Sequence, residues 1–195
     1  MTNYSKKIPP HLDGYLDNYI LKTVKYINPY FKTLNFTPNH ITTISLIFGI
    51  ISIFFLHENI HYFSALALFI SYFFDCQDGN YARQYKMVTK NGDIYDHVKD
   101  IIVYILLILV LITKINNPLI TILYIVIITI FLIFLTNYVS CTEKYMNKED
   151  KSFTLNFISN CKGNPEERLK ILRHFCAANF TVLICILIIL NKFIK

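Results

Sequence analysis

The sequence predicts an all-α integral membrane protein, in which five to six transmembrane helices are preceded by an interfacial amphipathic helix. Of its 195 residues, 54% are hydrophobic and 16% are charged, against about 25% charged residues in a typical soluble domain. The mean hydropathy is +0.41. Apolar residues gather in runs of about 15–24 positions separated by short polar turns, which is typical of helices that cross a bilayer.

Residues 1–36 are predicted to form an N-terminal segment ahead of the first apolar run. Within it, apolar side chains recur at helical spacing over residues 12–27, and Pro29 is expected to end this helix. The helix is too polar to span a bilayer, which favours a position at the membrane interface. Packing against the body of the same protein is the alternative, and the two are compatible. Asp13 and Asp17 are expected on its solvated face.

Residues 37–195 are predicted to form the transmembrane domain. Thr37 or Asn39 is expected to cap its first helix. The polar stretch 140–175 is expected to contain a helix from Glu166 onward, because an Asn-Pro pair precedes acidic residues there. A sixth span either lies within that stretch or is missing from this chain. The five predicted spans are residues 41–56, 60–83, 92–115, 119–139 and 176–190.

The distribution of cations predicts the orientation in the membrane. Five Lys or Arg residues precede the first span, three lie between positions 83 and 90, and seven lie between positions 144 and 173. These fifteen residues share one side, which places the N-terminus and that side in the cytoplasm. A net charge of +6 is therefore explained by topology and lipid contacts, and no nucleic-acid partner is predicted. The four remaining cations are Lys99, inside the third span, and Lys114, Lys192 and Lys195.

The five cysteines are scattered along the chain and form no C-x-x-C motif. Their odd number and irregular spacing favour reduced side chains that contribute to packing.

Five of the 13 acidic residues lie at the junction of the second and third spans: Asp75, Asp78, Asp93, Asp96 and Asp100. At about 100° per residue, the first two share one face of their helix, and the last three share one face of the next helix. A short loop makes these helices antiparallel neighbours, so their acidic faces are expected to meet. Carboxylates at a membrane edge are costly without a compensating partner.

Oxygen ligands alone favour Mg²⁺, Mn²⁺ or Ca²⁺ over zinc. Four carboxylates suit two divalent ions, the arrangement that clamps a pyrophosphate during displacement at phosphorus. The small residues Gly79 and Ala82 share the face of Asp75 and Asp78 and would let a nucleotide approach the helix backbone. Arg83 would supply a planar cation for phosphate.

Simpler interpretations apply to some of these residues individually. Asp93 alone is expected to cap its helix or to lie at the surface. Arg83 alone is typical of a cytoplasmic anchor. His97 is expected to line the pocket or to form a hydrogen bond, with metal ligation as the alternative. None of these interpretations explains the two acidic pairs that face each other across consecutive helices.

The pattern D-x2-D-G-x2-A-R-x8-G-x3-D-x3-D is met in full between Asp75 and Asp100, with eight fixed residues over 26 positions. It resembles the signature of the CDP-alcohol phosphotransferase (phosphatidyltransferase) family. The segment 37–42, TPNHIT, is similar to the family element that precedes its first helix. The resemblance is strong over residues 37–115, and family members usually have six spans.

The resemblance implies transfer of a substituted phosphate from a CDP-linked donor to an alcohol hydroxyl, with release of CMP and formation of a phospholipid. It implies two Mg²⁺ or Mn²⁺ ions, with Asp78 shared between them, a lipid-bilayer setting and a homodimer. Asp100 would complete the second metal site and act as general base. The implied metal ligands are Asp75, Asp78, Asp96 and Asp100, and the implied substrate-binding residues are Asn39, His40, Ile41, Thr42, Gly79, Ala82, Arg83, Thr89 and Gly92.

Several alternatives stay open. The donor is either CDP-diacylglycerol, with inositol, serine or glycerol phosphate as acceptor, or CDP-choline or CDP-ethanolamine, with diacylglycerol as acceptor. The Asp96-His97 pair resembles the second subclass, whereas the short chain resembles the first. Outside these enzymes, the chain could be a divalent-cation carrier or an inactive structural member. A carrier is expected to have carboxylates at mid-membrane depth near broken helices, and an inactive member is expected to lose signature residues.

Overall fold

The structure is a computed structural model, and it describes residues 8–146, 151–155, 158 and 160–193. Residues 1–7 of the predicted N-terminal segment lie outside this part. The described residues form helices and connecting turns, without a strand. The helices are α1 (Tyr15–Thr33), α2 (Pro38–His57), α3 (His61–Gln84), α4 (Lys90–Thr113), α5 (Pro118–Tyr145), α6 (Pro165–Leu172), the 3-10 turn η2 (Arg173–Phe175) and α7 (Ala177–Asn191).

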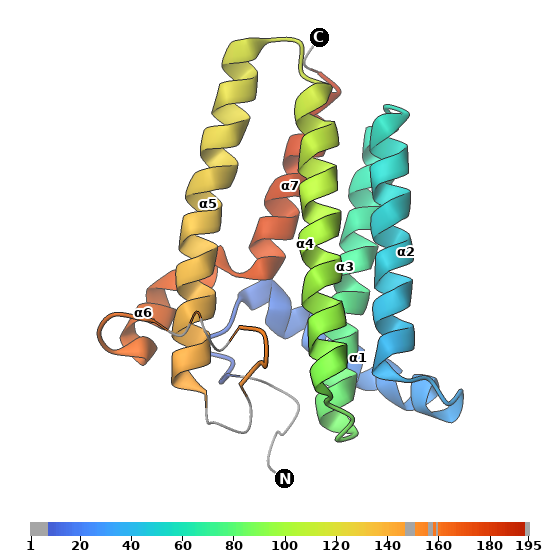
Figure 1. The fold of residues 1–195 in the computed structure, drawn as a ribbon, viewed down its shortest axis with the longest axis vertical. Coiled ribbons are helices and arrows are strands. Elements are labelled where there is room, and N and C mark those ends of the chain that lie inside the picture. Colours follow the sequence, from blue (N-terminus) through green and yellow to red (C-terminus); the bar gives the residue numbers. More distant parts are fainter. Residues whose placement is uncertain (1–7, 147–150, 156–157, 159, 194–195) are drawn as a thin grey trace.

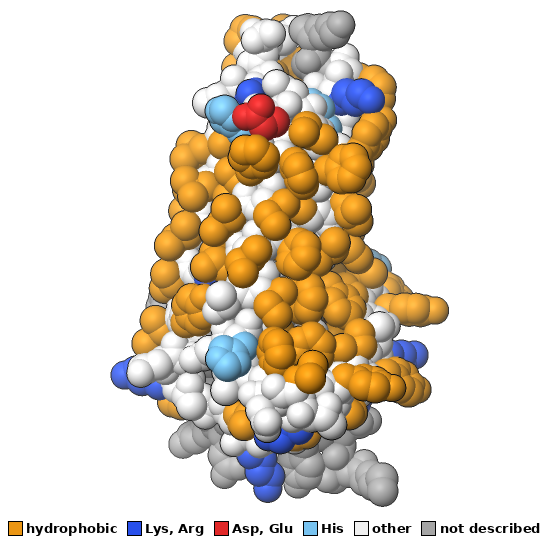
Figure 2. Space-filling view, turned by 90° about the vertical axis from the view of Figure 1, so that its right-hand side faces the viewer, with side chains coloured by type: hydrophobic (Ala, Val, Ile, Leu, Met, Phe, Trp, Pro, Cys, Tyr) orange, Lys and Arg blue, Asp and Glu red, His pale blue; other side chains and the backbone are white. Residues whose placement is uncertain are grey.

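Helices α2, α3, α4, α5 and α7 form an upright bundle, and α1 and α6 lie across its lower end (Figure 1). Three segments are long and apolar enough to cross a membrane by length and composition: Pro38–His57, Pro118–Tyr145 and Pro165–Asn191. This indicates a membrane protein. Figure 2 shows hydrophobic side chains along the middle of one face, with charged side chains toward its ends. The prediction of five to six spans stays a prediction, as does the cytoplasmic orientation.

The polar stretch 140–175 contributes the short helix α6. As expected from the Asn-Pro pair, Asn164 caps α6 by accepting the backbone N–H of Glu166 at 3.0 Å, with Pro165 at the first helical position. Helix α6 is only eight residues long, and the chain becomes extended at Cys176 before α7 begins. Helix α6 alone is therefore too short to form the predicted sixth span.

Small polar residues bring α2 and α3 close together. Ser45 and Ser71 donate reciprocally to each other's backbone carbonyls, at 2.9 and 2.8 Å, and Ser52 and Ser64 repeat the arrangement two turns away. A Cβ at Gly49 of α2 would lie 2.9 Å from Val103 of α4, so glycine is needed for that approach. Small residues at helix contacts are typical of membrane bundles. The two helices that carry the acidic residues, α3 and α4, are thus packed tightly against α2.

Helix α1 packs on α3 and α7, which is the alternative placement considered from its sequence. Ile20 and Val24 are buried, and Asn28, fully buried, donates through its amide to Asn80 at 3.0 Å and to Gln84 at 2.7 Å. Its exposed side carries tyrosines at positions 15, 19, 26 and 30, a residue type enriched at membrane interfaces. An interfacial position for α1 stays a prediction.

The expectation that Asp13 and Asp17 are solvated is wrong. Both are buried, with 9% and 8% of their surfaces exposed. Asp13 accepts the hydroxyl of Tyr138 of α5 at 2.9 Å, and Asp17 accepts the hydroxyl of Tyr72 of α3. Helical periodicity placed these residues opposite the apolar stripe, but long tyrosines from the neighbouring helices reach them. A buried carboxylate is tolerated where donors satisfy it.

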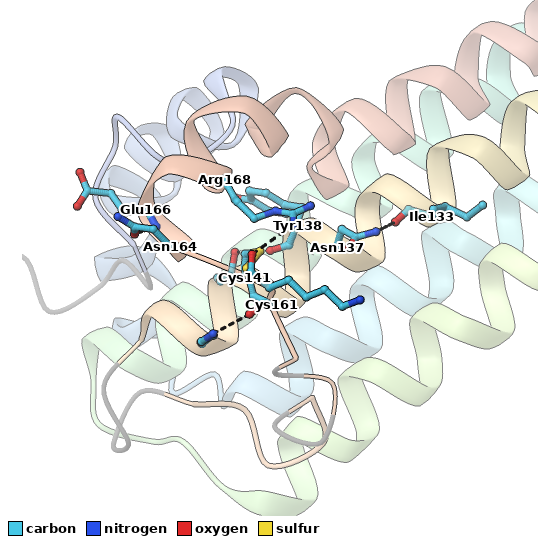
Figure 3. The surroundings of a disulfide bond; sticks show 11 residues. Ile133, Asn137, Tyr138, Cys141, Cys161, Asn164, Glu166 and Arg168 are labelled. Atoms are coloured by element: carbon cyan, nitrogen blue, oxygen red, sulfur yellow. Dashed lines mark hydrogen bonds between the residues drawn. A yellow bond between two sulfur atoms is a disulfide. The ribbon is translucent and has the colours of Figure 1, made fainter.

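The expectation that all five cysteines are reduced is wrong for two of them. Cys141, in the last turns of α5, forms a disulfide with Cys161, which precedes α6 (Figure 3). The loop between these helices folds back on α5, and Lys144 donates to the carbonyl of Cys161 at 2.6 Å. The spacing of the cysteines in the sequence does not show that this loop folds back onto α5. The cysteines at positions 76, 176 and 185 are free.

Candidate active site

The acidic residues of α3 lie in its last three turns, beside the start of α2. Asp78 is 3% exposed and its Oδ2 accepts the hydroxyl of Thr42 at 2.6 Å. Thr42 lies in the first turns of α2, whose N-terminus is capped by Thr37 as expected, through a hydrogen bond from the His40 backbone N–H. The cap thus fixes the turn that presents a hydroxyl to the buried carboxylate.

The acidic residues of α4 lie near its start. Thr89 caps this helix by accepting the backbone N–H of Gly92 at 3.1 Å. The carboxylates of Asp96 and Asp100 are partly exposed, at 25% and 37%. As predicted from the short connecting loop, the acidic end of α3 lies beside the acidic start of α4 (Figure 1).

One ligand oxygen each from Asp75, Asp78 and Asp96 lies within 4.8 Å of the others. Asp96 Oδ1 is buried and accepts no well-aligned hydrogen bond within the described part of the chain. Converging carboxylate oxygens, one of them without a well-aligned hydrogen bond, fit a hard divalent cation such as Mg²⁺ or Mn²⁺. These three residues fit one such ion.

Lys99 is the cation at the centre of this cluster. Its side chain is 1% exposed, and its ammonium Nζ contacts Asp75 Oδ1, Asp100 Oδ1 at 2.7 Å and Asp96 Oδ1 at 3.3 Å. It also donates to Ser45 Oγ of α2 at 3.1 Å. Asp100 therefore pairs with a lysine, where the sequence predicted a second divalent ion. From its position in the sequence, Lys99 was expected within a span, and this role was not predicted. A lysine inside a predicted span was the signal that could have revealed it.

The residues expected to bind a nucleotide surround these helix ends. Arg83 Nη1 lies 3.2 Å from where a Cβ would stand on Gly79, so the guanidinium covers this glycine. Ala82, the residue before Arg83 in α3, is partly buried. Asn39 and His40 are exposed at the start of α2.

Other residues of the predicted nucleotide set have structural contacts. Ile41 is fully buried, and Thr89 is the cap of α4. A Cβ on Gly92 would stand 2.9 Å from Thr89 Oγ1 and 3.1 Å from Asn39 Oδ1. Gly92 thus allows the start of α2 to approach the start of α4.

A family model described as CDP-alcohol phosphatidyltransferase matches residues 35–192. The chain belongs to this family. No curated protein and no solved structure matched the chain significantly. The CDP-alcohol phosphatidyltransferases are phosphotransferases of phospholipid synthesis, and they use divalent metals. The match begins two residues before Thr37 and includes every helix from α2 to α7.

Within this member of the family, Asp93 and His97 bind a loop. Asp93 accepts the hydroxyl of Ser152 at 2.9 Å and both the backbone N–H and the hydroxyl of Thr154, at 2.9 and 2.7 Å. His97 Nδ1 lies 2.7 Å from the carbonyl oxygen of Asp93 and 3.1 Å from Thr154 Oγ1. The expectation that Asp93 caps α4 or lies at the surface is wrong, because Thr89 is the cap and the Asp93 side chain is 14% exposed. His97 has the hydrogen-bonding role that was expected.

Proposed function

We propose that the protein transfers a substituted phosphate group from a CDP-linked donor to an alcohol hydroxyl and releases CMP. The observation that supports this most directly is the convergence of Asp75, Asp78 and Asp96 within 4.8 Å beside an arginine that covers Gly79. In a family of phosphotransferases, this combination fits a cation-bound pyrophosphate whose nucleotide lies along the end of α3.

The signature residues have distinct proposed roles. Asp75, Asp78 and Asp96 would hold a divalent ion, which neutralises the pyrophosphate and the departing CMP when it is bound. Arg83 would bind a phosphate through its planar guanidinium. Gly79 and Ala82 would leave room for the nucleotide. The exposed start of α2, at Asn39 and His40, and Thr42, Thr89 and Gly92 beside it, would complete the nucleotide site.

Asp100 is the proposed general base. Its carboxylate is the most exposed of those that contact Lys99, so an alcohol can reach it. Asp100 would accept the hydroxyl proton while the alcohol oxygen forms its bond to the phosphorus next to the non-cytidine group. The bond from that phosphorus to the bridging oxygen breaks, and CMP leaves with that oxygen. The product is a phosphodiester.

The proposed setting is the cytoplasmic side of a membrane. The site lies at the end of the bundle where the α3–α4 turn, the α5–α6 loop and α1 are gathered (Figure 1), and this end carries most of the cations in the sequence. Exposed apolar side chains of α4, among them Ile101, Ile102 and Ile105, continue from the site along the bundle. A lipid substrate would reach the site along such a surface. A homodimer is a further proposal, which light scattering of the purified protein tests.

Two donor classes remain candidates, and one assay separates them from each other and from the non-enzymatic alternatives. Membranes containing the protein are incubated with labelled CMP, Mg²⁺ or Mn²⁺, and either CDP-diacylglycerol with inositol, serine and glycerol phosphate, or CDP-choline with diacylglycerol, because CMP can re-enter the donor only by attacking the phosphodiester product. We expect label to enter one of the two CDP-alcohols, because the reaction is reversible at the phosphorus. Exchange into neither, nor into CDP-ethanolamine, would refute the enzyme assignment and favour the carrier or the inactive structural member. Membranes lacking the protein are the control.

A further inference from the structure

We propose that the Lys99 ammonium takes the place of one of the two expected divalent cations, so that the substrate-free protein binds a single divalent ion. That ion is held by Asp75, Asp78 and Asp96, and Lys99 neutralises Asp100. The inference rests on the proposed metal site but not on transferase activity.

The contacts of Lys99 hold its ammonium within the carboxylate cluster. An ammonium has three N–H donors, and three partners accept from this one: Ser45 Oγ at 3.1 Å, Asp75 Oδ1, and Asp100 Oδ1 at 2.7 Å. The side chain is 1% exposed, and partners on α2, α3 and α4 surround its Nζ. If the ammonium moved to the surface, Asp75 and Asp100 would lose the cation that they share.

The partners of Lys99 are also the ligands that a second ion would need. Asp100 was expected to complete that second site, and its Oδ1 is the oxygen in contact with Nζ. By contrast, Asp78 Oδ2 accepts from Thr42, and Asp96 Oδ1 lies 3.3 Å from Nζ without a well-aligned hydrogen bond. Asp78 and Asp96 therefore keep oxygens for a metal, whereas Asp75 and Asp100 each already pair with the ammonium through one oxygen.

Charge balance leads to the same conclusion. Four ionised carboxylates carry four negative charges, and Lys99 with one divalent ion neutralises three of them, which leaves one negative charge in a cluster where Asp96 and Asp100 are partly exposed to solvent. Two divalent ions would neutralise all four and leave the ammonium as a buried, uncompensated positive charge, which is strongly unfavourable. A second ion therefore enters only if Lys99 leaves the carboxylates, or if a substrate brings additional negative charge.

Counting bound Mn²⁺ tests the inference without any turnover. The purified, metal-free protein in detergent micelles is titrated with Mn²⁺, in the absence of a CDP-alcohol, and free Mn²⁺ is followed by electron paramagnetic resonance. We expect one Mn²⁺ per wild-type chain and an uncoupled signal. Two tightly bound ions, or the coupled signal of two ions about 3.5–4 Å apart, would overturn the inference, and so would the absence of any bound Mn²⁺.

The variant Lys99→Met keeps the length of the apolar stem and removes the charge. We expect it to bind a second Mn²⁺, and binding of a single ion would contradict the role of Lys99. Lys90→Met is the matched control, because Lys90 is exposed at the start of the same helix, and it should keep one ion. If Lys99→Met does not elute as folded protein, Lys99→Gln replaces it, and the wild-type count decides by itself in either case. An inactive protein that binds one Mn²⁺ would refute the proposed function and leave this inference standing.

Discussion

The carboxylate of Asp93 accepts both the backbone N–H and the hydroxyl of Thr154, at 2.9 and 2.7 Å. These residues are 61 positions apart, and their contact fastens the α5–α6 loop to the start of α4, one turn before Asp96. The position of this loop beside the candidate active site therefore depends on a carboxylate that belongs to no signature position.

Replacing Asp93 with Ala is expected to release residues 151–155 from α4. Amide hydrogen exchange at Thr154 should become faster, because its N–H loses a charged acceptor, and the cost in stability should be on the order of 2 kcal/mol. Exchange measured by mass spectrometry checks this, with Asn91→Ala, an exposed neighbour, as control. Unchanged exchange at Thr154 would show that the loop is held by other contacts.

Replacing Asp100 with Asn should abolish the proposed transfer while the protein stays folded. Asparagine preserves the shape and the contact with Lys99 but removes the base, a group that typically contributes about 10²- to 10⁴-fold to the rate. The rate of CMP exchange is the measurement, and the elution volume in size-exclusion chromatography is the check on folding. A fully active variant would remove Asp100 from the role of general base.

Replacing Thr42 with Val should weaken divalent-metal binding. The hydroxyl of Thr42 donates to Asp78 at 2.6 Å, and loss of such an outer partner typically lowers metal affinity by about 10- to 100-fold. The Mn²⁺ dissociation constant measures the effect. Thr42→Ser retains the hydroxyl and should bind like the wild type. Equal affinities for the Val and Ser variants would argue against the proposed ligand role of Asp78.

Replacing Asn28 with Ala should destabilise the attachment of α1 to α3. The buried amide makes two hydrogen bonds, to Asn80 and Gln84, and their loss is expected to cost about 1–3 kcal/mol. Thermal unfolding in micelles gives the measurement. Tyr26→Ala is the control on the same helix, because Tyr26 is 79% exposed. If both variants unfold at the wild-type temperature, α1 contributes little to the stability of the bundle.

Hydropathy and helix-starting residues predicted the apolar helices closely, whereas the expectation that Pro29 ends the first helix is wrong, because α1 continues through Pro29 to Thr33. The apolar runs at 41–56 and 119–139 lie within Pro38–His57 and Pro118–Tyr145, and a proline opens both helices. Periodicity also brought the two acidic pairs together, because a short turn makes α3 and α4 antiparallel neighbours. These features are local, so the chain itself encodes them within a few residues.

Contacts between distant segments could not be predicted in the same way. Lys99 lies between signature positions, and its partner Ser45 is 54 residues away. The Asp13 bond to Tyr138 crosses 125 residues. Such contacts depend on the packing of several helices, which one-dimensional periodicity does not describe. The α5–α6 loop has no periodic pattern, so neither its return to Asp93 nor its disulfide was expected.

The Cys141–Cys161 bond lies at the same end of the molecule as the candidate active site. Its redox state therefore indicates on which side of the membrane this end lies. Thiols that face the cytosol are kept reduced, whereas disulfides persist in oxidising compartments. The redox state of this pair in intact cells, read by alkylation before lysis, thus reports which compartment surrounds the catalytic end. Free thiols would agree with the asymmetry of the cations, and an intact bond would place that end on the opposite side of the membrane.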